Sequence, residues 1–249
     1  MKKIALIPAR YAATRFPGKL MQKLGDQTVI LSTYRSTVQT GLFDDVAVVC
    51  DSEIIYNEIT GNGGKAVMSR REHECGTDRI AEALDAFPDA EIIVNVQGDE
   101  PFTSKAPMEK LLRVFEGADG AAVQVASLMQ VLSDPVAIAD PNYVKVAVDL
   151  RDNALFFSRS PIPYHRDQQA KPVYYEHIGI YAFRRQTLID FTQLPVSPLE
   201  AAEKIECLRY LENGIRMKMV VTEYMGVEID TPEDLLKAEQ YLAGKSAKY

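Results

Sequence analysis

The sequence has few cysteines, and their arrangement excludes two classes of protein. Cys50, Cys75 and Cys207 are the three cysteines in 249 residues. They are odd in number and far apart, so they predict neither a disulfide framework nor a zinc site with closely spaced ligands. This usage is typical of a protein that works in a reducing compartment.

Long apolar runs are also missing. The first residues, MKKIALIPARYAA, resemble a signal peptide, but Pro8 and Arg10 interrupt the apolar stretch before it reaches the roughly 7 to 15 residues that such a signal needs. No run approaches the ~20 residues of a membrane-spanning helix. We therefore expect a cytoplasmic protein with no membrane partner.

Positive charge is in deficit, since 28 lysines and arginines stand against 35 aspartates and glutamates, a formal net charge of -7. This balance argues against general binding to nucleic acid or to anionic membranes. One local exception is the segment IPARYAATRFPGK at residues 7–19, which holds Arg10, Arg15 and Lys19. The cluster predicts a site for a local anion.

Two glycine-rich nucleotide motifs are absent. A phosphate-binding loop of the Walker type needs Ser or Thr after Gly-Lys, but Leu20 follows Gly18-Lys19, and Ala13 stands where the first glycine belongs. The three glycines of a dinucleotide-binding fingerprint do not follow the first apolar run either. The sequence thus argues against an NAD-dependent dehydrogenase.

Short apolar runs and segments of helical spacing alternate along the chain, and this predicts an α/β fold with a mostly parallel central sheet flanked by helices. The apolar content of 47% is enough for one large or two modest globular domains. Strands are predicted in residues 2–9, 44–51, 91–101, 120–128, 143–149, 177–185 and 216–224. Helices are predicted in residues 28–41, 77–87, 104–117 and 198–214. The Pro-rich segment 160–172 reads as an excursion from the sheet.

Polar residues follow several predicted strands directly, among them Arg10, Asp51 and Asp99. Ligands of such sheets bind at the carboxyl ends of the strands. The first loop combines small residues, including Ala9, with permanent cations, and this suits a polyphosphate. A solvated basic loop paired with nearby acids is the alternative for the cluster taken alone.

Two acidic segments are candidate metal ligands. In VNVQGDEP, Asp99 follows a strand and a glycine, and hard carboxylate oxygens there suit Mg²⁺. In EIDTPEDL, Thr231 and Pro232 resemble a helix start, so Asp230 is either part of that cap or a second metal ligand. An ordinary turn or helix cap is the alternative for Asp99 as well.

Read together, several segments resemble the signature blocks of the 3-deoxy-manno-octulosonate (Kdo) cytidylyltransferase family. The segments are IPARYAATRFPGK, SRREHECGTDRIAEA, NVQGDEP, PNYVKVAVD, LFFSRSPIP, HIGIYAFRR, LPVSPLEAAEKIECLR and EIDTPEDL, between residues 7 and 235. The resemblance implies a Rossmann-like nucleotidyltransferase fold with a smaller dimerisation and sugar-binding part, as one cytidylyltransferase domain over residues 1–249. It also implies a cytoplasmic, Mg²⁺-dependent homodimer that converts CTP and Kdo to CMP-Kdo and pyrophosphate for lipopolysaccharide biosynthesis.

The same resemblance implies roles for individual residues. Arg10, Arg15 and Lys19 would bind the CTP phosphates, with Lys19 at the α-phosphate, while Asp99 and Asp230 would hold Mg²⁺. The anomeric C2 hydroxyl of the sugar would attack the α-phosphorus in line. The remaining implied contacts on the nucleotide side are Ala9, Arg70, His73, Cys75, Gly76 and Thr77. Those on the sugar side are Arg79, His177, Tyr181 and Glu206, with Arg79 at the sugar carboxylate. Gln97 and Arg159 are further implied substrate contacts.

The sequence departs from the family pattern at two positions. Cys75 stands where a serine before Gly-Thr is usual, and Cys207 stands where glutamine is expected. Both leave open a cytidylyltransferase for another acid sugar, such as 8-amino-Kdo or a sialic acid. A non-catalytic nucleotide sensor is the alternative of another class. Without the resemblance, His177 and Tyr181 could be core residues, and Arg79 and Glu206 could be solvated surface.

Overall fold

The computed structural model describes residues 1–12, 16–73, 75–167, 169–223 and 227–246. These residues form two compact units. Unit 1 comprises residues 1–108 and 225–249, and unit 2 comprises residues 109–224. The single domain over residues 1–249 stays a prediction, because compact units need not be separate domains.

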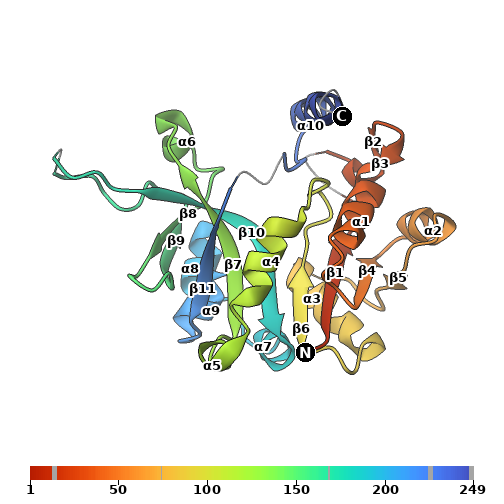
Figure 1. Ribbon diagram of the computed structural model, residues 1–249, viewed down its shortest axis with the longest axis horizontal. Coiled ribbons are helices and arrows are strands. Elements are labelled where there is room, and N and C mark those ends of the chain that lie inside the picture. The colour runs from red at the N-terminus through yellow and green to blue at the C-terminus, as the bar shows by residue number, and fades with distance from the viewer. Residues whose placement is uncertain (13–15, 74, 168, 224–226, 247–249) are drawn as a thin grey trace. The chain divides into compact units, whose positions relative to one another are not determined.

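A parallel sheet in the order β6-β1-β4-β5 forms the centre of unit 1 (Figure 1). Its strands are β1 (Lys3–Ala9), β4 (Asp45–Cys50), β5 (Ala66–Met68) and β6 (Ile92–Asn95). In β1 every residue from Ile4 to Ala9 is buried, which explains why its sequence is a continuous apolar run instead of an alternating one. All four carboxyl ends therefore meet at one edge of this sheet.

Helices cover both faces of the unit 1 sheet. α1 (Val29–Gln39) and α2 (Glu53–Gly61) pack on one face, in front of the sheet in Figure 1, and α3 (Gly76–Glu82) packs behind it against β1 and β6. Side chains fix two of the helix starts, since Thr28 accepts a hydrogen bond from Leu31 N and Ser52 accepts one from Ile54 N. A 3-10 turn, η2 (Ala83–Ala86), continues α3.

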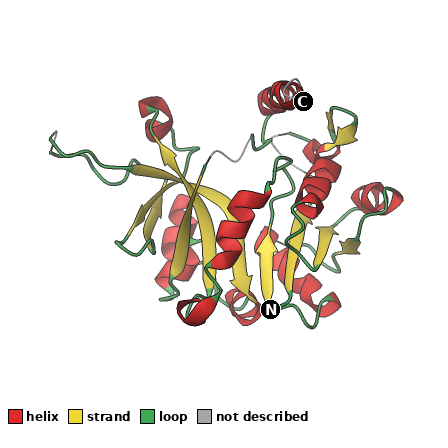
Figure 2. Ribbon diagram, in the orientation of Figure 1, coloured by secondary structure: helices red, strands yellow, loops and turns green. Residues whose placement is uncertain are grey.

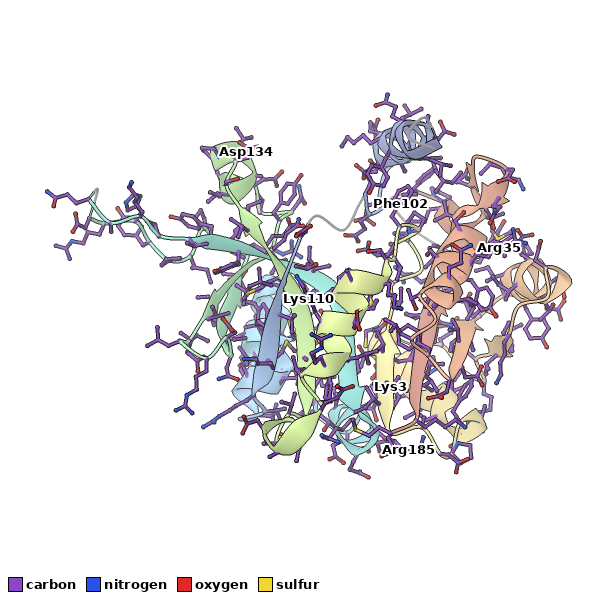
Figure 3. The ribbon with its side chains drawn as sticks, viewed as in Figure 1. Lys3, Arg35, Phe102, Lys110, Asp134 and Arg185 are labelled. Carbon is purple, nitrogen blue, oxygen red and sulfur yellow. The ribbon has the colours of Figure 1, made fainter. Side chains whose placement is uncertain are left out.

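The last helix, α10 (Pro232–Ser246), returns to unit 1 from far along the chain. Its start is as predicted: Pro232 is the first helical residue, and Thr231 Oγ1 accepts a hydrogen bond from Asp234 N at 3.2 Å. Phe102, labelled in Figure 3, packs edge-on against Tyr241 of this helix with ring centroids 4.6 Å apart. Nearby are η1 (Lys19–Met21) and the short pair β2 (Lys23–Leu24) and β3 (Gln27–Thr28).

Unit 2 contains a mixed sheet in which β7 (Val125–Leu132) lies between β10 (Tyr174–Arg184) and β11 (Met217–Thr222). β10 runs antiparallel to β7, and β11 runs parallel to it. The hairpin of β8 (Lys145–Val148) and β9 (Ala154–Ser158) joins this sheet because β8 pairs with β10. The helices of unit 2 are α5 (Gly117–Gly120), α6 (Pro135–Ala139), α7 (Arg185–Phe191), α8 (Pro198–Glu203) and α9 (Leu208–Glu212), and α4 (Lys105–Arg113) contains the boundary between the units.

The structure confirms the predicted α/β class, with helices and strands distributed as Figure 2 shows. Each predicted strand is present, and the described residues of segment 160–172 lie between β9 and β10, outside the strands. The single helix predicted over 198–214 is wrong: Lys204 has a φ of 55°, which ends α8 before α9 begins. A buried ion pair joins the two pieces, with Arg209 Nε 2.7 Å from Glu200 Oε2. None of the helices in the described part of the chain is long and apolar enough to cross a membrane.

Candidate active site

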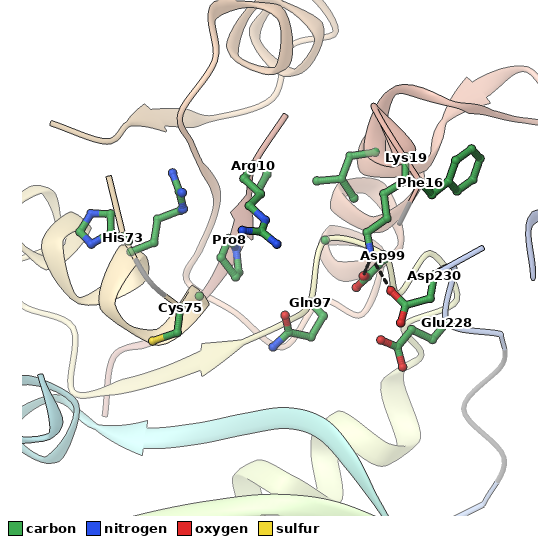
Figure 4. A pocket seen from close by; sticks show the side chains of 15 residues that line it. Pro8, Arg10, Phe16, Lys19, His73, Cys75, Gln97, Asp99, Glu228 and Asp230 are labelled. Atoms are coloured by element: carbon green, nitrogen blue, oxygen red, sulfur yellow. Dashed lines mark hydrogen bonds and ion pairs between the residues drawn. The ribbon is translucent and has the colours of Figure 1, made fainter. Parts of the chain in front are cut away.

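The carboxyl edge of the unit 1 sheet carries a cavity of about 330 Å³, a size typical of small-molecule sites. Residues that follow three strands or open a helix at this edge form its wall (Figure 4). The lining residues are Pro8, Ala9, Arg10, Phe16, Lys19, Leu20, His73, Cys75, Gly76, Arg79, Gln97, Gly98, Asp99, Glu228 and Asp230. Ten of the predicted site residues are thus brought together. Arg70 and Thr77 are close in sequence to this group but do not line the cavity.

Glycine lets the loop after β6 approach β1 closely. A Cβ atom on Gly98 would lie 3.0 Å from the Pro8 carbonyl oxygen and 3.3 Å from the side chains of Ile30 and Leu20. On the other side of β1, a Cβ atom on Gly76 would lie 3.1 Å from Pro8 Cγ. The absence of a side chain at both positions allows Asp99 and the start of α3 to reach the same cavity.

Charged groups gather at one end of the cavity, on the right in Figure 4. The Lys19 ammonium donates hydrogen bonds to Asp99 Oδ2 and, at 2.8 Å, to Asp230 Oδ1. Burial lowers the pKa of Lys19, but the attraction of Asp99 and Asp230 outweighs it, and the net pKa is raised above the ordinary value. Lys19 therefore stays protonated at any working pH.

Arg10 lies at the middle of the cavity and is exposed to solvent. Among the residues that the structure describes, its guanidinium has no ion-pair partner, so its charge is available to an anion. Arg15, the third cation of the predicted cluster, lies outside the described residues.

Glu228 is a third carboxylate at the charged end, and the sequence reasoning missed it. One oxygen from each of Asp99, Glu228 and Asp230 lies within 4.8 Å of the others. Glu228 itself is exposed to solvent, and its carboxylate lies where the negative charges of Asp99, Glu100 and Asp230 act to raise its pKa. The sequence contained a signal for Glu228, because residues two apart in an extended segment point to the same side, and Glu228 is two residues before Asp230. In the structure Ile229, between them, is fully buried and donates its N–H to Asp99 O.

The other end of the cavity, on the left in Figure 4, contains His73 and Cys75. The His73 side chain is 2% exposed, and its Nε2 lies 2.9 Å from Glu82 Oε2. The same carboxylate accepts a 2.6 Å hydrogen bond from Arg70 N, and although burial raises the pKa of Glu82, these hydrogen bonds lower it overall. Cys75 is the residue before α3, where its side chain caps no backbone group. Its base contact stays a prediction.

Arg79 is buried, with 4% of the residue exposed, which excludes the solvated-surface alternative. Its Nη1 donates to Ser69 Oγ at 2.9 Å, and its Nη2 donates to Asp51 Oδ2 at 3.2 Å. Arg79 lines the cavity, and two protein groups hold its guanidinium.

Within unit 2, the structure places His177, Tyr181 and Cys207 together. The rings of His177 and Tyr181 have centroids 5.4 Å apart, and the Tyr181 hydroxyl donates a hydrogen bond to the Cys207 sulfur. Burial lowers the pKa of His177 to about 4, and burial raises the pKa of Tyr181 well above its ordinary value. The negative charge of the adjacent Glu206 contributes to the shift of Tyr181.

Arg159 of unit 2 is held by backbone carbonyls. Its side-chain Nε donates to the Glu203 carbonyl oxygen at 2.7 Å, and its Nη1 donates to the Pro141 carbonyl oxygen at 2.8 Å. Its backbone N–H donates to the Glu203 carboxylate. The side chain joins three segments of unit 2. Its substrate contact stays a prediction.

The geometry of unit 1 suits phosphoryl chemistry on a nucleotide. Lys19 and hard carboxylates share one end of the cavity, and Arg10 lies at its middle. The other end presents a buried histidine, a thiol and close-packed backbone. Such an arrangement can neutralise a polyphosphate and position it, which is most of what phosphoryl transfer requires. A covalent nucleophile is not needed for it.

Comparisons with known proteins agree with this chemistry. A family model described as Cytidylyltransferase matches residues 4–219. A Flavobacterium johnsoniae protein named 3-deoxy-manno-octulosonate cytidylyltransferase is 57% identical, covering 97% of this chain and 99% of the relative. A protein of the same name from Christiangramia forsetii is 55% identical, covering 96% of each chain. A solved structure of CMP:2-keto-3-deoxy-manno-octonic acid synthetase complexed with CTP has a TM-score of 0.93 and 38% identity, covering 98% of this chain and 100% of that one.

Proposed function

This chain belongs to the cytidylyltransferase family, and from that premise we propose that it transfers CMP from CTP to the anomeric C2 hydroxyl of Kdo. The products are CMP-Kdo and pyrophosphate. The observation that carries the proposal is the cavity of unit 1, where Lys19, Asp99 and Asp230 converge and which the exposed Arg10 also lines. The proposed setting is cytoplasmic lipopolysaccharide biosynthesis.

The proposed reaction is an in-line displacement. The sugar hydroxyl oxygen forms a bond to the α-phosphorus and releases its proton to water, while the bond from that phosphorus to the bridging oxygen breaks and pyrophosphate leaves with the electron pair of that bond. Lys19 donates hydrogen bonds to the α-phosphate, where negative charge develops, and Arg10 and Arg15 bind the leaving phosphates. Positioning and charge neutralisation supply most of the reduction of the barrier.

We propose Mg²⁺ as the cofactor, held by Asp99 and Asp230. The donor set fits a hard cation, because carboxylate oxygens lie within 4.8 Å of one another and the Lys19 ammonium already marks a cation position between two of them. When bound, Mg²⁺ would supply neutralisation of phosphate charge. Glu228 adds a third carboxylate to the same position.

The proposed substrate residues fall in both units. Ala9, His73, Cys75, Gly76 and Gln97 line the cavity of unit 1 and are proposed for the nucleotide. His177, Tyr181 and Glu206 of unit 2 are proposed for the sugar acid. The neutral form of His177, favoured by its low pKa, can both donate and accept hydrogen bonds with sugar hydroxyls or neighbouring groups.

The experiment is a measurement of pyrophosphate release with CTP, ATP, GTP and UTP against Kdo, 8-amino-Kdo and a sialic acid. We expect turnover only when CTP, Kdo and Mg²⁺ are all present, and EDTA should abolish it until Mg²⁺ is restored. Comparable turnover of ATP would contradict the base assignment. A preference for another acid sugar would identify the alternative cytidylyltransferase, and CTP binding without turnover would identify a sensor.

A further inference from the structure

We propose that Asp51 is a positioning residue for the nucleotide cavity, and that Arg79 acts with it on the nucleotide side instead of binding the sugar carboxylate. The inference rests on the proposed function, because it assigns a task within the binding of CTP. Four segments of unit 1 support it, because they are joined through the Asp51 carboxylate and the Arg79 guanidinium.

Asp51 directly follows β4 and holds the main chain of the first loop. Its Oδ1 accepts a 2.9 Å hydrogen bond from the backbone N–H of Tyr11. Tyr11 is the neighbour of Arg10, the exposed cation at the middle of the cavity. The carboxylate therefore fixes the backbone from which the Arg10 side chain extends.

The second oxygen of Asp51 binds Arg79. Arg79 Nη2 lies 3.2 Å from Asp51 Oδ2, and its Nη1 donates to Ser69 Oγ at 2.9 Å. Ser69 is itself tied to the end of β4, since its N–H donates to Cys50 O at 2.7 Å. The loop after β1, the ends of β4 and β5, and α3 are thus joined through one carboxylate and one guanidinium.

The contacts of Arg79 leave it poorly suited to bind a second carboxylate. The side chain is 5% exposed, and its charge is already paired with Asp51. A substrate carboxylate would have to compete with Asp51 and Ser69 for the guanidinium, because Nη1 and Nη2 each already donate to one of these two groups. Asp51 itself does not line the cavity, so it acts through Arg79 and the first loop.

The test compares Asp51→Asn, Asp51→Ala, Ser69→Ala and Arg79→Lys with wild type. Asn keeps an acceptor for Tyr11 N–H and loses the charge, while Ala loses both. The matched control is Asp45→Asn, because Asp45 lies at the opposite end of the same strand and pairs with Lys65 just before β5. The measurements are CTP affinity by calorimetry with Mg²⁺ and no sugar, kcat, KM for each substrate, and the thermal unfolding midpoint.

We expect Asp51→Asn to weaken CTP binding about tenfold, because the hydrogen bonds of Asp51 lose their charge. Asp51→Ala should weaken binding further, because it removes these hydrogen bonds altogether. Arg79→Lys and Ser69→Ala should shift CTP affinity in the same direction, with KM for Kdo within about twofold of wild type. Asp45→Asn should leave CTP affinity unchanged even if it lowers the unfolding midpoint.

Two results would overturn the inference. If Arg79→Lys raised KM for Kdo strongly and left CTP affinity intact, Arg79 would belong to the sugar site. If Asp51→Asn changed CTP affinity no more than Asp45→Asn did, Asp51 would be merely structural. Failure of the proposed function is distinguishable, because wild-type protein would then neither bind CTP nor release pyrophosphate from CTP and Kdo.

Discussion

At the scale of single residues, one lysine organises the charged end of the cavity. The Lys19 ammonium is neutralised by Asp99 and Asp230. A bound triphosphate would supply a new partner for the Lys19 ammonium, and a divalent cation would supply one for the carboxylates of Asp99 and Asp230. Such an exchange of partners would keep each of these charges paired and would avoid the large cost of an isolated buried charge.

Lys19→Ala should lower kcat by about 10²–10³-fold and change CTP affinity far less, because a charge at the α-phosphate acts mainly in the transition state. Steady-state kinetics and calorimetry measure the two effects separately. Lys23→Ala, an exposed lysine in β2, is the control and should change neither. A rise in KM for CTP with an unchanged kcat would contradict this role for Lys19.

His177 predicts a pH dependence of stability. Its pKa is about 4 in the folded protein, against an ordinary value of 6.5, because burial disfavours the imidazolium. Between these values the unfolded chain binds a proton that the folded chain does not. The free energy of unfolding should therefore fall as pH is lowered from 6.5 to 4, with a slope from this group of at most about 1.4 kcal/mol per pH unit.

Urea unfolding at a series of pH values measures this slope. His177→Asn should have a shallower slope than wild type in the same window, and His165→Asn, in the loop before β10, should retain the wild-type slope. Equal slopes for His177→Asn and wild type would show that His177 does not have the expected shift.

At the scale of elements, close approach of backbones decides where the loop after β6 lies. Gly98 packs against the Pro8 carbonyl of β1, and this contact places Asp99 at the cavity. The neighbouring backbone cannot move aside without disturbing the centre of the parallel sheet. The loop geometry thus depends on a contact with a segment some ninety residues earlier in the chain.

Gly98→Ala should reduce the free energy of unfolding by about 1–3 kcal/mol, because the new methyl group would lie 3.0 Å from a backbone oxygen. It should also lower kcat by displacing Asp99. Gly61→Ala, at the end of α2 with nothing within 4 Å of the added Cβ, is the control and should be neutral or stabilising. Chemical denaturation measures both, and equal effects would contradict the packing argument.

At the scale of the whole molecule, we propose that the chain is a homodimer. Most of its exposed large apolar side chains belong to unit 2, among them Val131, Leu150 and Leu155. Covering such side chains in a second copy would be favourable. Light scattering coupled to size exclusion should give twice the 27.8 kDa chain mass. Leu155→Glu should shift the mass toward one chain, and Val38→Glu, on the exposed side of α1 in unit 1, is the control.

Much of the fold was predictable because it follows from local patterns. The continuous apolar run of β1 and the Thr231-Pro232 start of α10 are readable from neighbouring residues alone. The break between α8 and α9 was not, because it depends on a left-handed Lys204 and on the buried pair of Glu200 and Arg209. An ion pair between two residues nine positions apart leaves no periodicity in the sequence.

The sequence by itself determined the class of the fold, the strand-end position of Arg10 and Asp99, and, through its motifs, the family. These depend on residue type and spacing, which the chain carries directly. Only the tertiary structure decided that Glu228 joins Asp99 and Asp230, and that Asp51 and Ser69 hold Arg79. Both arrangements join residues that are distant in the chain, and their partners are selected by how the strands and helices pack.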